Sequence, residues 1–117
     1  MSIYICRFTY PSVGYAATLE KPNDREAAAQ VGFGAVGAKV RDVYYSAATG
    51  ELVCIAEGDA AQMSAARMMT MAAGAPNVSV EDLITPSEMA AAMKLAGKAA
   101  SKYKPNQLAR GKHESST

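Results

Sequence analysis

The stretch KVRDVYYSAATGELVCIAEGD (Lys39–Asp59) decides the fold, because its pattern is that of two strands joined by a tight turn. Lys39–Ala47 is rich in valine and tyrosine, and Glu51–Glu57 alternates between the two faces of a strand. Ala48–Gly50 forms the turn between them, with a glycine that can adopt positive φ. The sequence therefore predicts an antiparallel hairpin near the middle of the chain.

A strand and two helical segments are predicted before the hairpin. Ile3–Thr9 has the alternation of a strand. A short helical segment is predicted over residues 12–20 with Ser12 as its cap, and a longer helix begins at Asn23 or Asp24 and ends near Gly37. We expect the longer helix to bury a stripe of small apolar residues: Ala27, Val31, Ala35 and Ala38. Close packing on a sheet would explain its three glycines, Gly32, Gly34 and Gly37.

Two helices and a strand are predicted after the hairpin. Asp59 and Gln62 form a capping box for a helix that ends near Ala73, and Val78–Ile84 is predicted to be a strand. The run Thr85-Pro86-Ser87-Glu88 combines a threonine cap, a proline at the first helical position and a glutamate at the third. It therefore marks the start of a C-terminal helix.

The order β-α-β-β-α-β indicates an α+β, ferredoxin-like fold with a four-stranded antiparallel sheet, because the crossovers are right-handed. Residues 1–85 form this domain, and residues 86–104 form the additional C-terminal helix. Residues 105–117 are polar and basic and are predicted to be a disordered tail.

One face of the predicted sheet is left open, because both crossover helices cover the other face. If Cys6 and Phe8 point toward the helices, the open face carries four large apolar residues: Ile3, Ile5, Val53 and Ile55. Such a face is too apolar for a monomer. It predicts a homodimer or higher oligomer with sheets packed face to face, as in a dimeric α+β barrel.

Composition indicates one ordinary domain, since the chain has 117 residues and half of them are apolar. Residues 1–93 carry six basic and ten acidic residues, whereas residues 94–117 carry six basic residues and one acid. The basic charges are sparse and lack interleaved aromatic residues, which disfavours nucleic acid as a partner. The sequence shows no charged leader followed by an apolar h-region, no apolar run of membrane length and no C-x-x-C spacing, so we expect no signal peptide. We therefore expect a cytoplasmic protein of bacterial type with two buried thiols and no membrane association.

Few groups in the sequence suit catalysis or metal binding. The one histidine, His113, lies in the tail, so we expect no catalytic triad, no zinc or copper site and no cofactor. The run GFGAVG (Gly32–Gly37) resembles a dinucleotide fingerprint, but it lies within or at the end of a predicted helix instead of opening one. The candidate ligand-binding residues are Arg7, Tyr44, Tyr45, Glu51 and Glu57. Adjacent tyrosines on a strand point to opposite faces, so one of the pair Tyr44 and Tyr45 is expected in the core. An ion pair between Arg7 and Glu57 at a dimer interface is the structural alternative.

Four motifs resemble the GYD-domain family of small bacterial and archaeal proteins: YICRFTYPS, KPNDREAA, GAKVRDVYY and TPSEMAAAM with YKP. The resemblance spans Tyr4–Pro105 and implies a dimeric ferredoxin-like fold, without an established activity to transfer. The Gly-x-Tyr-Asp tetrad of the family corresponds to Ala48-Thr49-Gly50-Glu51, where only the acidic position is kept. Any role of the tetrad tyrosine therefore does not carry over.

These observations favour a non-catalytic, homo-oligomeric module that binds a small molecule or a partner protein. One alternative is a cofactor-independent enzyme of isomerase or monooxygenase type, in which Arg7 stabilises an anion, a glutamate acts as base and a tyrosine as acid. The other is an accessory subunit that docks on a larger assembly through its basic C-terminal segment. The residues expected to contact such a partner are Met89, Met93, Lys94, Lys98, Lys102 and Tyr103.

Overall fold

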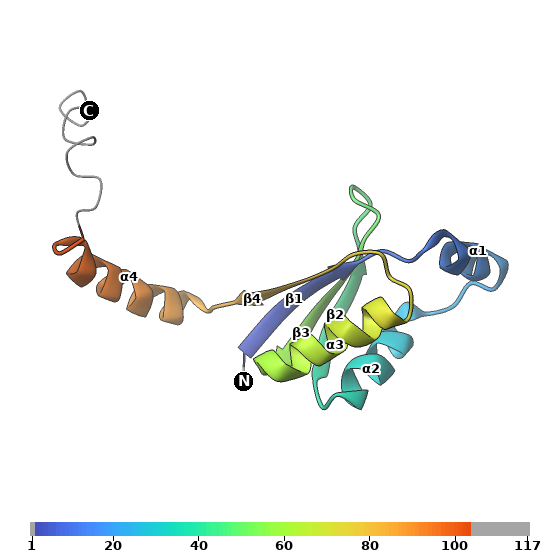
Figure 1. Ribbon diagram of the computed structural model, residues 1–117, viewed down its shortest axis with the longest axis horizontal. Helices are drawn as coiled ribbons and strands as arrows, with labels where there is room; N and C mark the ends of the chain where they lie inside the picture. Colours follow the sequence, from blue (N-terminus) through green and yellow to red (C-terminus); the bar gives the residue numbers. More distant parts are fainter. Residues whose placement is uncertain (1, 104–117) are drawn as a thin grey trace, which may run out of the picture. The chain divides into compact units, whose positions relative to one another are not determined.

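The predicted central hairpin is present, and the chain around it folds as expected for an α+β protein (Figure 1). The computed structural model describes residues 2–103. Its elements in chain order are β1 (Ser2–Phe8), α1 (Ser12–Glu20), α2 (Arg25–Ala35), β2 (Lys39–Tyr45), β3 (Leu52–Gly58), α3 (Ala60–Ala72), β4 (Val78–Leu83) and α4 (Pro86–Ala100).

The four strands form one antiparallel sheet in the order β2-β3-β1-β4. This is the order of a ferredoxin-like fold, so the predicted fold class is confirmed. The sheet is not closed, and β2 and β4 are its edges. A bulge between Val40 and Asp42 interrupts the pairing of β2 with β3.

The two faces of the sheet follow the predicted alternation. In β3, Leu52, Cys54 and Ala56 are buried, whereas the residues between them are only half-buried. Cys54 lies opposite Cys6 of β1, which is also buried, so both strands direct these side chains to the same face of the sheet, toward the core. The prediction of two buried thiols is confirmed.

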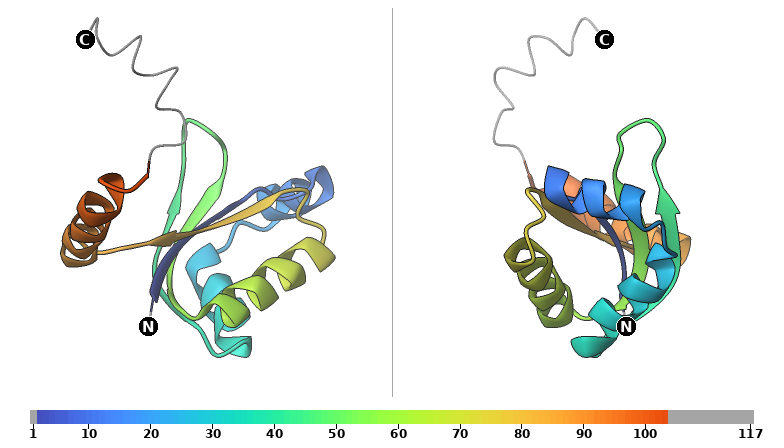
Figure 2. Two further views of the ribbon diagram at one scale, coloured as in Figure 1. Left: turned by 60° about the vertical axis from the view of Figure 1, so that its left-hand side comes forward. Right: turned by 90° about the vertical axis from the view of Figure 1, so that its right-hand side faces the viewer.

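Helices α2 and α3 cover this inner face (Figure 2). Phe33 of α2 packs with Met63 and Ala66 of α3 against the buried residues of the strands. The predicted stripe on α2 is wrong for three of its four members, because Ala27, Val31 and Ala35 are exposed and only Ala38 is buried. The helix instead turns Ala29, Phe33 and Val36 toward the sheet. Burial of the large Phe33 ring removes more apolar surface from water than burial of alanines does.

Close packing on the sheet does not explain the glycines in α2. A methyl group added at Gly32 or Gly34 would meet nothing within 4 Å, whereas Gly37 has a positive φ of 84°. The close approach of helix to sheet lies instead at Gly58, where an added Cβ would come within 2.9 Å of Met63. Gly50 has a φ of 74°, as the turn requires.

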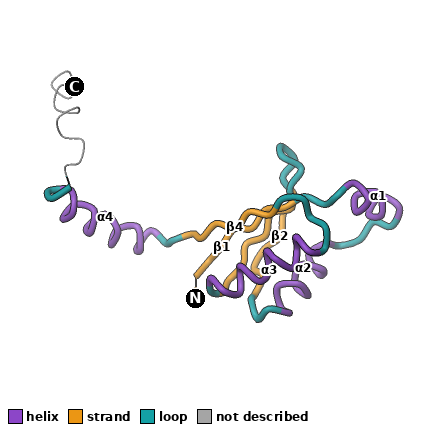
Figure 3. The backbone as a smooth tube through the Cα atoms, viewed as in Figure 1, coloured by secondary structure: helices purple, strands orange, loops and turns teal. Residues whose placement is uncertain are grey.

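The helix starts confirm most of the predicted caps. The Asp24 side chain accepts a hydrogen bond from the backbone of α2, and Asp59 with Gln62 and Thr85 with Glu88 form complete capping boxes. Ser12 is not a cap, because α1 begins at Ser12 and its N-cap residue is Pro11. Along the chain, helix α1 follows β1 and precedes α2, and none of its residues is buried (Figure 3).

The chain divides into two compact units, Met1–Leu83 and Ile84–Thr117. In the second unit, the predicted C-terminal helix is present as α4, and none of its residues is buried. No helix within residues 2–103 has the length and apolar character needed to span a membrane. The predicted tail of residues 105–117, with His113, lies outside the described residues.

Candidate ligand-binding site

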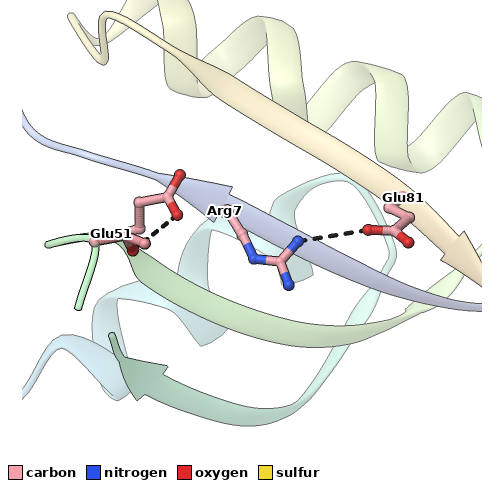
Figure 4. Close-up of polar contacts among 4 residues, drawn as sticks. Arg7, Glu51 and Glu81 are labelled. Carbon is pink, nitrogen blue, oxygen red and sulfur yellow. Dashed lines mark hydrogen bonds and ion pairs between the residues drawn. The ribbon is translucent and has the colours of Figure 1, made fainter. Parts of the chain in front are cut away.

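The structure distributes the polar residues predicted on the open face over separate contacts. Arg7 forms an ion pair with Glu81 of β4, with 3.4 Å between Nη1 and Oε1. Glu51 instead accepts a hydrogen bond of 2.9 Å from the Thr49 hydroxyl at the hairpin turn. Figure 4 shows the Arg7 side chain directed toward Glu81, with Glu51 in a contact of its own.

Glu57, the other predicted acid, pairs with Arg41 at 3.1 Å. It lies opposite Ile3, whereas Arg7 lies opposite Val53, so the two charges are four positions apart along the paired strands. Both observed ion pairs are partly exposed to solvent and contribute little stability. Arg7 thus has neither predicted acid as its partner within the described residues.

An apolar strip nevertheless runs along the open face, as predicted. Ile5 and Ile55 are paired directly between β1 and β3, and Ile3 and Val53 lie on the same side of these strands. Leu83 of β4 lies opposite Ile3 and widens the strip. All five side chains are accessible to solvent in this chain.

The adjacent tyrosines of β2 are both exposed, at 62% for Tyr44 and 61% for Tyr45, so the expectation that one lies in the core is wrong. Val43 takes the inner position opposite Cys54. Tyr44 and Tyr45 lie at the end of the strand, where both line a groove of about 390 Å³ together with Tyr10 and Tyr15.

A polar junction that sequence reasoning missed joins Tyr10, in the loop after β1, to the start of α2. The Nε atom of Arg25 donates a hydrogen bond of 2.8 Å to the Tyr10 hydroxyl, and Nη1 donates one of 3.1 Å to the Asn23 side chain. The guanidinium carbon also lies 5.1 Å from the centre of the Tyr10 ring. Edge-to-face contacts with Phe8 and Tyr15 hold that ring in place.

A cavity of about 270 Å³ lies behind this junction, between α2 and α3. Its lining is mostly apolar and includes Phe8, Gly32, Phe33, Leu52 and Met69. Thr70 also lines it, but its hydroxyl donates to the Ala66 carbonyl and is thereby occupied. Tyr10 and Arg25 line both the cavity and the tyrosine groove, so they stand between the two.

Among residues 2–103, Arg25 is the only charged residue in the lining of the cavity, and its side chain is half-buried. The ion pairs of residues 2–103 are Arg7–Glu81 and Arg41–Glu57, so Arg25 has no carboxylate partner there. A half-buried cation at the edge of an apolar cavity favours an anion from outside the chain.

The two thiols do not supply a nucleophile. Burial raises the pKa of Cys6 to about 11 and that of Cys54 to about 12, the latter with a smaller contribution from the neighbouring Cys6. Both cysteines are therefore protonated thiols at neutral pH.

No family model, curated protein or solved structure matches this chain. The resemblance to the GYD-domain family thus stays a prediction, and functional inference depends on the geometry of the site.

Proposed function

We propose that this protein is a non-catalytic, homodimeric module that binds a small apolar molecule in the cavity between α2 and α3. The observation that carries the proposal is the cavity itself, which has a volume of about 270 Å³, a mostly apolar lining, an open side and one polar junction at its edge. An apolar cavity of about 150 Å³ is enough to bind benzene. The volume here is near the lower end of natural ligand pockets, so the ligand is small.

The lining favours binding over catalysis. Arg25 and Tyr10 are hydrogen-bond donors, suited to hold a ligand in one orientation. The lining formed by the described residues includes no carboxylate, histidine or cysteine that would accept a proton from a substrate.

Filling the cavity tests this function. Octanol, a neutral apolar probe, should bind the wild-type protein in isothermal titration calorimetry. Gly32→Leu should weaken octanol binding at least tenfold, because Gly32 lines the cavity and an added side chain meets open space. The matched control is Gly34→Leu, which lies on the same helix, outside the cavity lining, and should bind octanol as the wild type does. Absence of octanol binding, or equal binding by both variants, would refute the proposal.

The apolar strip on the open face supports the homodimer. Two sheets stacked face to face would remove Ile5, Ile55 and their neighbours from water. Glu81 lies opposite Ile5 on this face, so its ion pair with Arg7 would border the same contact. In α4, Met89 and Met93 are also exposed and offer further apolar surface to a partner.

Sedimentation velocity tests the dimer. The wild type should sediment as a dimer, and Ile55→Glu should sediment as a monomer, because stacking would bury two carboxylates opposite each other. Met68→Glu introduces the same charge at an exposed position of α3 and should leave the dimer intact. A monomeric wild type, or an Ile55→Glu variant that remains a dimer, would contradict the proposed interface.

A further inference from the structure

We infer that the ligand of the α2–α3 cavity is a small amphipathic acid whose single carboxylate binds Arg25 and Tyr10 while its apolar part fills the cavity. This inference rests on the proposed function and adds the chemical class of the ligand.

The donors of Arg25 are only partly used. A guanidinium carries five N–H groups, of which Nε–H is bonded to Tyr10 and one hydrogen of Nη1 to Asn23. Three N–H groups, two of them on Nη2, are thus left for an external acceptor. A carboxylate can accept two of them side by side in the fork geometry that arginine favours.

Tyr10 adds a further donor in a fixed place. Its oxygen accepts the hydrogen bond from Arg25, which leaves its own O–H free to donate to the same carboxylate. Its ring centre lies 5.7 Å from that of Phe8 and 5.4 Å from that of Tyr15. Because the aromatic neighbours and Arg25 already order this phenol, a ligand would lose little free energy in fixing it.

The charges around the junction limit the headgroup to one negative charge. Arg25 is the first residue of α2, so the partial positive charge of the helix N-terminus adds to its own. On the groove side, however, Asp24 and Glu26 line the wall, and Asp24 already accepts a backbone hydrogen bond from α2. A doubly charged phosphate that extended toward them would be repelled, whereas a carboxylate can stop at Arg25.

The volume sets the length of the apolar part. If about 150 Å³ holds the six carbons of benzene, the cavity of about 270 Å³ holds roughly ten non-hydrogen atoms. Octanoate reaches this size with its carboxylate included, its apolar part having about seven carbons, and serves as the probe. Octanol is the matched molecule with a hydroxyl in place of the carboxylate.

Calorimetry with the two probes tests the inference. Wild-type protein should bind octanoate at least tenfold more tightly than octanol, since hydrogen bonds to a charged group are the stronger ones. Arg25→Gln should reduce octanoate affinity at least tenfold and octanol affinity by a smaller factor, so that the preference for octanoate is lost. Arg41→Gln removes the same charge from β2, away from the cavity, and should keep the preference for octanoate.

Arg25→Lys is a second variant that keeps the charge without the fork, and its octanoate affinity should lie between those of the wild type and Arg25→Gln. Equal wild-type affinities for octanoate and octanol would refute the inferred binding of a carboxylate. The proposed binding of an apolar molecule would still stand, provided that Gly32→Leu weakens octanol binding. If Arg25→Gln still prefers octanoate, the carboxylate binds to residues other than Arg25, and the inference is wrong. If neither probe binds, both the inference and the proposed function fail.

Discussion

Replacing Gly32 by leucine should raise the free energy of unfolding by more than the same replacement at Gly34. Both glycines lie in α2, and an added Cβ meets nothing within 4 Å at either position. Each replacement therefore gains the difference in helix propensity between glycine and leucine, about 0.8 kcal/mol. Only Gly32 lines the cavity, so only there does the new side chain also become buried.

The additional gain at Gly32 follows from the cavity. Full burial of a leucine side chain contributes about 1.5–3 kcal/mol, and the cavity is open on one side, so we expect about 1 kcal/mol from partial burial. The four side-chain carbons of leucine are fewer than the six of benzene, which a cavity of about 150 Å³ holds, so the cavity has room for them. Gly32→Leu should thus be about 2 kcal/mol more stable than the wild type, and Gly34→Leu about 0.8 kcal/mol.

Equilibrium urea unfolding of the three proteins, followed by circular dichroism, measures these differences. Because both variants gain the same helix propensity, the difference between their free energies of unfolding reports the burial of the leucine side chain in the cavity alone. Equal stabilities, or a less stable Gly32→Leu, would show that the space beside Gly32 does not accept a side chain and is therefore too small for a ligand.

Two further predictions concern the core. Met63→Ala should lower the free energy of unfolding, measured by urea titration, by about 2–5 kcal/mol, because Met63 is only 1% exposed. Met68→Ala on the same helix, at 69% exposure, should change it by less than about 0.5 kcal/mol. Similar losses in the two variants would mean that α3 presents a different face to the core. The thiols should make stability depend on pH: their pKa values are raised on folding to about 11 and 12, so the unfolded chain loses these protons first and stability falls as the pH rises from about 9 toward 11. Cys54→Ala should flatten that decline, and identical pH slopes for variant and wild type would contradict the assignment.

The parts of the fold that depend on local chemistry were accessible from the sequence. Caps such as Asp59 are hydrogen bonds within one turn of chain, and the inward position of Cys54 follows from the period of two in a strand. The orientation of α2 was not accessible in this way. A stripe of alanines and valine has the same helical spacing as the observed inner face, and only the fit of the Phe33 ring against the sheet decides between them.

The site depends on contacts between distant segments, which no local pattern reveals. Glu81 reaches Arg7 because β4 pairs with β1 in one particular register, and Glu57 instead pairs with Arg41 beside the bulge of β2. The cavity likewise combines residues of β1, α2 and α3, and the junction at its edge pairs Tyr10 with Arg25, fifteen positions apart. The two predicted tyrosines, Tyr44 and Tyr45, line the groove that shares this junction.

The bulge in β2 has a consequence for how copies of the protein meet. An exposed strand edge is a template on which another chain can add a strand, and it thereby promotes aggregation. Here the edge strand β2 is interrupted between Val40 and Asp42, and its exposed charged side chains, Lys39, Arg41 and Asp42, surround the interruption. A second strand laid along this edge would lose regular pairing and meet charges. The irregular strand thus protects the protein against growth of the sheet by lateral addition.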